Sequence, residues 1–339
     1  MRISMLPRIE VWTLAKAGAR GWLCAAFGLV LMGCGPSVMF GASGVGSNLL
    51  QADAVAPAST PSGLVAARGL VERGHLPEAE AAVRGYLQEK GESGGADFML
   101  GYVLFREGKA KESLGAYTRG ARLATPTAHA LMIVALDYVL LDDYVDAQRW
   151  LLESTQRDGS DAEAWYSLGR VQYKLNRFDD AVRSLQRSLE LTPRSVKAAD
   201  NLGLALAALN RGDEAVAAYR QAIAWQADAV HPSEQPLLNL GSLLLERNQL
   251  AEATQLLERA VAIAPNDAKI QEELGRVYLL QNCLEVAASH LEQAVTLAPE
   301  DSRLHFQLGQ VYRKLGRTGR AKAEFERTAE LNGTHSTPE

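Results

Sequence analysis

Residues 162–195 read AEAWYSLGRVQYKLNRFDDAVRSLQRSLELTPRS, and this stretch decides the fold. It contains two small residues, Gly169 and Ala181, and two helices can approach closely only where small side chains meet. Asn176, between them, tolerates the left-handed conformation that ends a helix. Pro193 cannot continue a second helix. The stretch therefore predicts a pair of helices joined by a short turn.

The same pattern recurs eight times with a period of 34 residues. The windows begin at 60, 94, 128, 162, 196, 234, 268 and 302, with a four-residue insertion at 230–233. The eighth window position is always small: Ala67, Gly101, Ala135, Gly169, Gly203, Gly241, Gly275 and Gly309. So is the twentieth: Ala79, Ser113, Ala147, Ala181, Ala215, Ala253, Ala287 and Ala321. The fifteenth is only Gly, Asn or Asp: Gly74, Gly108, Asp142, Asn176, Asn210, Asn248, Asn282 and Gly316.

The period and the pattern W-x2-L-G-x2-Y…A-x3-F…P resemble the tetratricopeptide repeat. The fourth window carries the resemblance best, through Trp165, Leu168, Gly169, Ala181, Leu185 and Pro193. The resemblance implies an all-α protein, an α-solenoid of about eight helix-turn-helix repeats in a right-handed superhelix with a concave groove. The predicted repeats are 60–93, 94–127, 128–161, 162–195, 196–229, 234–267, 268–301 and 302–335, followed by a tail at 336–339. The insertion at 230–233 is either a longer turn or a bend between two halves of the stack.

Composition and motifs exclude several classes of function. The 339 residues carry a formal charge of −5, which argues against nucleic acid as a partner. No metalloprotease, serine-hydrolase or nucleotide-binding motif occurs, and the six histidines lack metal-ligand spacing. The acidic pairs at 142–143 and 179–180 lie at inter-helix turns, where capping explains them, and Cys283 is expected to be a free thiol. We therefore expect a non-enzymatic protein with no cofactor, metal or small-molecule substrate.

The N-terminus resembles a bacterial lipoprotein signal peptide. Four basic residues among the first twenty precede the uncharged run GWLCAAFGLVLM at 21–32, and LMGC follows the lipobox pattern at 31–34. The resemblance implies cleavage after residue 33 and lipidation of Cys34. Residues 34–59 are rich in Gly, Ser, Ala and Pro and are expected to form a flexible linker behind the lipidated cysteine.

The competing interpretation is an uncleaved signal anchor, since Trp22 to Phe40 is about long enough to cross a bilayer. Both interpretations place the repeats outside the cytoplasm, because positive residues precede the apolar run. Gly35 after the cysteine resembles outer-membrane sorting more than inner-membrane retention. The expected location is a bacterial membrane, by a lipid anchor facing the periplasm, with an inner-membrane signal anchor as the alternative.

Positions two, five, nine, twelve and thirteen line the inner wall of the groove in this family. Windows two to four place an apolar, aromatic stripe there: Phe98, Tyr102, Phe105, Met132, Leu136, Val139, Tyr166 and Tyr173. Later windows place polar residues there: Lys197, Asp200, Arg276, Arg303, Arg313 and Lys314. Asn201 and Asn239 at position six resemble a short asparagine ladder that grips a peptide backbone. The stripe predicts a groove for an amphipathic helix or an extended apolar peptide.

The chain looks like the repeat lipoproteins that assist assembly of envelope complexes: pilus secretins, outer-membrane proteins or polysaccharide-export machines. The resemblance implies a membrane-anchored scaffold that binds protein partners of the bacterial envelope. The alternative is an adaptor that recruits or regulates a cell-wall enzyme.

Overall fold

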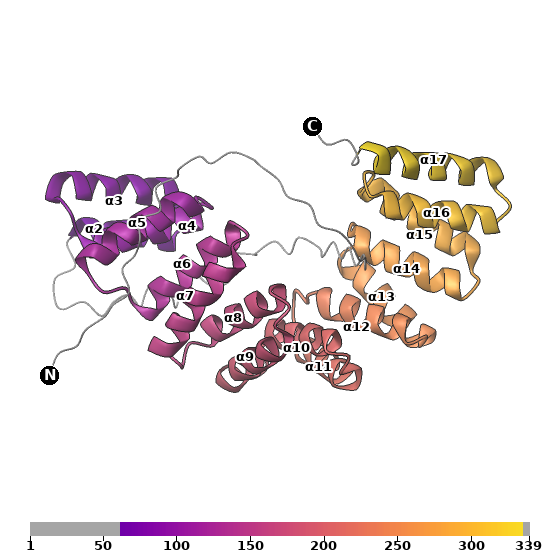
Figure 1. Ribbon diagram of the computed structural model, residues 1–339, viewed down its shortest axis with the longest axis horizontal. Helices are drawn as coiled ribbons and strands as arrows, with labels where there is room; N and C mark the ends of the chain where they lie inside the picture. Colours follow the sequence, from indigo (N-terminus) through magenta and orange to yellow (C-terminus); the bar gives the residue numbers. More distant parts are fainter. Residues whose placement is uncertain (1–61, 335–339) are drawn as a thin grey trace, which may run out of the picture. The chain divides into compact units, whose positions relative to one another are not determined.

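The computed structural model describes residues 62–334, which form sixteen α-helices and no strand (Figure 1). The first helices of the successive repeats are α2 (Ser62–Glu72), α4 (Gly94–Arg106), α6 (Ala128–Leu140), α8 (Ala162–Lys174), α10 (Val196–Ala208), α12 (Gln235–Glu246), α14 (Ala268–Leu280) and α16 (Ser302–Lys314). The second helices are α3 (Leu76–Lys90), α5 (Ala110–Leu123), α7 (Tyr144–Arg157), α9 (Phe178–Leu191), α11 (Gly212–Trp225), α13 (Leu250–Ile263), α15 (Leu284–Leu297) and α17 (Thr318–Thr334). The predicted all-α solenoid of helix pairs is confirmed.

Small residues set the distance within each helix pair, as the sequence predicts. A Cβ atom added to Gly169 would lie 2.6 Å from Cγ of Leu185, and one added to Gly203 would lie 2.5 Å from the ring of Tyr219. The second helix therefore packs its large side chain directly on the backbone of the first. Each second helix from α3 to α15 also packs on the first helix of the next repeat.

The turn between paired helices is left-handed in all eight repeats. The fifteenth window position has positive φ throughout, for example 58° at Asn176, 62° at Asn282 and 79° at Gly74. These residue types reach that conformation at low steric cost. The sequence pattern and the backbone agree at every one of these turns.

Side-chain caps begin most of the first helices. Ser93, Thr127, Asp161, Ser195 and Asp267 each accept hydrogen bonds from backbone N–H groups in the first turn of the helix that follows. Such caps satisfy donors that a helix leaves unpaired at its start. These contacts fix where the capped first helices begin, and so the register of their side chains.

The insertion after α11 is a turn closed by one buried side chain. The amide of Gln226 donates to the carbonyl of Ser233 at 2.7 Å and accepts from the Ser233 N–H at 2.9 Å. Helix α12 still packs on α11 and on α10. The insertion is therefore a longer turn across which the stacking continues, and the predicted bend stays untested.

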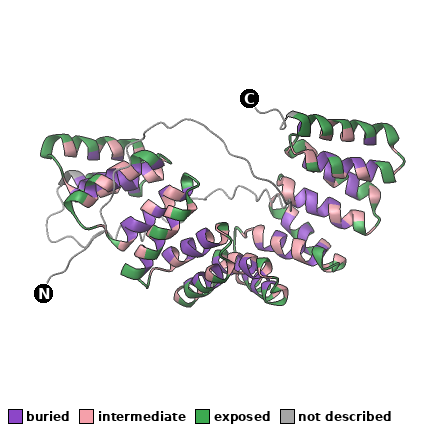
Figure 2. Ribbon diagram, in the orientation of Figure 1, coloured by how far each residue is buried: buried purple, intermediate pink, exposed green. Residues whose placement is uncertain are grey.

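Buried residues run along the facing sides of the paired helices (Figure 2). The predicted signal peptide, Cys34 and the linker lie outside the described residues. Within residues 62–334, no helix combines the length and the apolar character that crossing a bilayer requires.

Candidate functional site

The first helices carry every residue predicted to bind a partner. The apolar stripe lies on α4, α6 and α8, while Asn201 lies on α10 and Asn239 on α12. We call the side of these helices that bears window positions two, five, six, nine and twelve the helix-A surface. Its side chains come from consecutive repeats, so a ligand along it would contact several repeats at once.

Half of the apolar stripe belongs to the core. Tyr102, Met132, Val139 and Tyr166 are at most 8% exposed. The expectation of an exposed stripe is wrong for these four residues, because they pack in hydrophobic clusters that extend across neighbouring repeats. The other members are half-buried against the same clusters: Phe98, Phe105, Leu136 and Tyr173. Partner binding by the stripe stays a prediction, and only these half-buried side chains offer it accessible apolar surface.

Polar side chains gather on α8, α10 and α12. We call Glu163, Tyr166, Lys197, Asp200 and Asn239 the central polar cluster. The Lys197 ammonium lies 4.5 Å from the centre of the Tyr166 ring and also pairs with the Glu163 carboxylate. Contact between an ammonium and an aromatic face is attractive, and the ion pair adds to it. Lys197 keeps 49% of its side chain exposed, so a partner carboxylate can still reach it.

Asp200 is the buried acid of the cluster, with 6% exposure. Burial raises its pKa to about 6, a hydrogen bond from Asn239 lowers it, and the charge of Glu234 raises it again. The bond from Nδ2 of Asn239 to Oδ1 of Asp200 is 2.9 Å long and joins α12 to α10. A buried carboxyl group with a pKa of about 6 therefore lies on the same helix as the half-exposed Lys197, three residues further along α10.

The two predicted ladder asparagines are already engaged within the protein. Asn201 donates from Nδ2 to the Lys197 carbonyl of its own helix at 2.9 Å, and Asn239 donates to Asp200. Each amide retains a second N–H and its carbonyl oxygen. Their role in gripping a peptide backbone stays a prediction.

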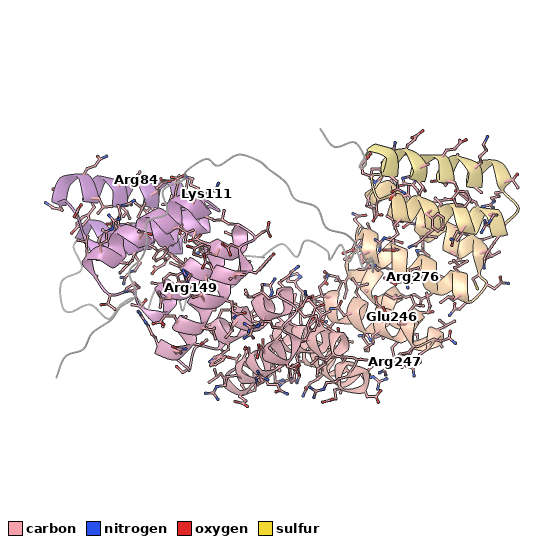
Figure 3. The ribbon with its side chains drawn as sticks, viewed as in Figure 1. Arg84, Lys111, Arg149, Glu246, Arg247 and Arg276 are labelled. Carbon is pink, nitrogen blue, oxygen red and sulfur yellow. The ribbon has the colours of Figure 1, made fainter. Side chains whose placement is uncertain are left out.

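A second polar network lies on α14 and α16. Glu272 and Glu273 are both 1% exposed. Glu272 accepts from Lys269 at 3.0 Å, lies 3.2 Å from Arg303 and accepts from Gln307 at 2.9 Å. Glu273 pairs with Lys269 at 2.8 Å and with Arg276 at 2.6 Å. Figure 3 shows Arg276 extending from α14. The buried acids thus hold three cations in fixed positions on the helix-A surface.

Comparison with protein families decides the family. The family model described as tetratricopeptide repeat matches residues 64–128, 166–232, 238–302 and 272–336, together more than half of the chain. The chain belongs to the tetratricopeptide repeat family. Proteins of this fold are generally interaction scaffolds, and no catalytic family is indicated. A search of curated proteins found no match.

Solved structures show the same fold at low sequence identity. PilW, described as a widely conserved type IV pilus biogenesis factor, is 22% identical over 64% of this chain and 97% of its own, with a TM-score of 0.56. A tetratricopeptide repeat protein from Parabacteroides merdae is 18% identical over 74% of this chain and 97% of its own, with a TM-score of 0.57. Yeast Tom70 is 15% identical over 80% of this chain and 57% of its own, with a TM-score of 0.53.

One buried group of this tetratricopeptide repeat array was not predicted. Asp137 on α6 is 0% exposed, and burial raises its pKa to about 8, while the hydrogen bond to Ser113 lowers it. Asp137 occupies the tenth position of its window, and other windows have an aliphatic residue there, as at Val103, Val171 and Val277. A single Asp among aliphatic residues at a core position marks a buried polar group.

The remaining features of the repeats have structural explanations. Asp143 caps α7 by accepting from the Asp146 N–H at 3.1 Å, and Cys283 is an exposed free thiol. Among the described residues no group of His, Cys, Asp or Glu has the arrangement of a metal site. A pocket of about 580 Å³ lies between α9 and α11, away from the helix-A surface, with Pro193 and Trp225 in its lining.

Proposed function

We propose that this protein is a membrane-anchored scaffold that binds a segment of a protein partner through the central polar cluster. The observation that carries the proposal is the set of side chains that three consecutive first helices bring together there. Lys197 is half exposed, Asp200 on the same helix is buried, and the bond from Asn239 to Asp200 joins α12 to α10. Such a site offers a cation, an acid and amides at fixed positions, as recognition of a polar peptide backbone and its side chains requires.

The anchor is proposed to be a lipid on Cys34, on the periplasmic side of a bacterial envelope. The support is the basic segment, the short apolar run and the LMGC sequence at 31–34. Anchoring a binding module to a membrane raises its effective concentration at partners on the same surface. We propose assembly of an envelope complex as the purpose, and the fold shared with PilW, a pilus biogenesis factor, makes pilus assembly the first case to examine.

Binding is tested by co-purification of crosslinked partners with the full chain. Lys197→Glu is expected to remove the partner while the melting temperature stays close to that of the wild type, because half of the Lys197 side chain is exposed to solvent. Its combination with Asn239→Ala is expected to remove the partner and also to lower the melting temperature, because Asn239 donates a hydrogen bond to the buried Asp200. Arg220→Glu is the matched control, since Arg220 is a half-exposed cation on a second helix, paired with Glu252. Undiminished capture by both cluster variants would refute the site.

The anchor is tested by mass spectrometry of the N-terminus of membrane-extracted protein. We expect a diacylated Cys34, and release of the chain from membranes in Cys34→Ser but not in Cys24→Ser. An intact Met1 in the extracted protein would contradict the lipid anchor and favour an uncleaved signal anchor. Partners that prove to be cell-wall hydrolases or synthases would point to the adaptor function instead.

A further inference from the structure

The side chain at the fifth window position is buried or half-buried in every described repeat except the last one. Met132, Tyr166, Asp200, Leu238 and Glu272 occupy it in consecutive repeats and are at most 8% exposed. Phe98 occupies it in the second repeat and is half-buried. Phe306 occupies it on α16 and is 46% exposed. Among the fifth-position side chains of the described repeats, Phe306 is thus the one left open to solvent.

The cover in the other repeats is the first helix of the repeat that follows. Helix α12 packs on α10, and α14 packs on α12 and α13, whereas no described helix follows α17. The second helices show the same contrast at the twenty-first position, where Val182 and Ala288 are buried but Lys322 is exposed. In Figure 2 most of α17 is coloured as exposed. We call Phe306, Arg313, Lys322, Phe325 and Ala329 the C-terminal end surface.

This surface combines aromatic rings with cations. The Phe306 and Phe325 rings lie 5.8 Å apart, and the Arg313 guanidinium lies 5.9 Å from the Phe325 ring. No carboxylate among the described residues pairs with Arg313, and Lys322, although it lies 3.5 Å from the Glu326 carboxylate, keeps 77% of its side chain exposed. Residues 302–335 contain seven Lys or Arg against three Glu, in a chain whose formal charge is −5. The surface therefore favours an acidic ligand over a neutral or basic one.

We infer that the C-terminal end surface binds an acidic amphipathic helix of a partner protein, in the place that a further first helix would occupy. The packing of the repeats defines the shape of the ligand, because from α4 to α12 each first helix packs on the first helix of the repeat that follows. Its apolar side would cover Phe306 and Phe325, and its carboxylates would face Arg313 and Lys322. This surface is separate from the central polar cluster, so either site can fail its test without the other.

The test uses a helix of the protein itself as the probe. A stapled peptide with the sequence of residues 161–174, DAEAWYSLGRVQYK, represents a first helix and its cap, with two acids and two bases. Stapling holds it helical, because a free peptide of this length is mostly unfolded. A second peptide carries Arg170→Glu and Lys174→Glu, which leaves four acids and no base. Both peptides are titrated into the full chain by fluorescence anisotropy.

We expect the acidic peptide to bind about tenfold more tightly than the unmodified one and to lose affinity at high salt. Phe306→Ala and Arg313→Glu are each expected to weaken binding by about tenfold, without a change in melting temperature because both side chains are exposed. Leu280→Ala is the matched control, as Leu280 is 58% exposed at the end of α14. Equal binding of the two peptides, or binding that survives both end-surface variants, overturns the inference. Self-association of the chain that Phe306→Ala abolishes also overturns it, by assigning the surface to a second copy.

Discussion

Asp137 is expected to make the array less stable as the pH rises. The Ser113 hydroxyl has one hydrogen but lies within hydrogen-bond distance of two acceptors, the Gly101 carbonyl at 2.8 Å and Oδ2 of Asp137. An ionised Asp137 competes with the Gly101 carbonyl for this one hydrogen, and its Oδ1 has no hydrogen-bond partner among the described residues. A protonated Asp137 can donate to Ser113 while Ser113 donates to Gly101. The geometry therefore favours the neutral acid.

The size of the effect follows from the pKa. Burial raises the pKa of Asp137 from 3.8 to about 8, so the folded state holds a proton that the unfolded chain releases above pH 4. The stabilisation is present at low pH and is lost as the pH rises from about 4 to about 8. About four pKa units correspond to about 6 kcal/mol as a ceiling. We expect about 3 kcal/mol, because relaxation and water penetration reduce the cost of a buried charge.

The assay is urea unfolding followed by tryptophan fluorescence at pH 4.5 and pH 8.5, comparing the wild type with Asp137→Asn and Asp137→Val. The asparagine variant keeps the shape and carries no charge, so its stability is expected to fall less between the two pH values. The valine variant restores the aliphatic type found at Val103, Val171 and Val277, and is expected to exceed the wild type most at pH 8.5. An equal pH dependence in all three proteins would refute the reasoning.

Three further changes probe the packing of the repeats by urea unfolding. Gly203→Ala is expected to lower the free energy of unfolding by about 1 to 3 kcal/mol, since the new Cβ would lie 2.5 Å from the Tyr219 ring. Gly85→Ala is the control: a Cβ there meets no heavy atom within 4 Å, so this change is expected to raise the free energy of unfolding by about 0.5 to 1 kcal/mol. Asn176→Ala is expected to cost about 1 to 2 kcal/mol because φ is 58° there, and an equal loss in Asn176→Gly would argue against backbone strain as the cause. Glu272→Ala is expected to cost about 2 kcal/mol by removing its bonds with Lys269, Arg303 and Gln307, while Lys269 keeps Glu273 and Arg303 keeps Asp301. Hydrogen exchange that stays unchanged in α14 would contradict that.

The helix pairs were predictable because local rules determine them. Small side chains at the crossing and left-handed residues at the turn act within one repeat, and the resulting positive φ values appear at all eight turns, from Gly74 to Gly316. Both patterns can be recognised in one sequence because only small residues fit the helix crossing and few residue types adopt the left-handed turn conformation. The local pattern and the global fold agree throughout the described repeats.

The exposure of the helix-A surface was less predictable because it depends on the neighbouring repeat. Tyr166 and Met132 match the family's inner-wall positions, yet both are buried against the core. Phe306 occupies the same window position and is exposed, because no described helix covers it. Burial at this position is set by what packs next to it rather than by its own residue type.

Electrostatic features needed the three-dimensional arrangement. Lys197 and Tyr166 lie 31 residues apart in the chain, and their contact joins two first helices. The hydrogen bond between Asn239 and Asp200 joins residues 39 apart, across the insertion. Neither pairing has a sequence signal of its own, because the spacing in each case crosses a repeat boundary.

The most direct measurement of partner binding is photocrosslinking in intact cells. A benzoylphenylalanine replaces Asn201, and the control carries it at Glu258 on α13. Asn201 is half-buried beside the central polar cluster, and Glu258 lies on a second helix. We predict that position 201 crosslinks to one defined segment of one envelope protein, that Lys197→Glu abolishes this crosslink, and that position 258 gives none. Crosslinks of equal yield from both positions, or a crosslink at 201 that persists in Lys197→Glu, would contradict the central polar cluster as the binding site.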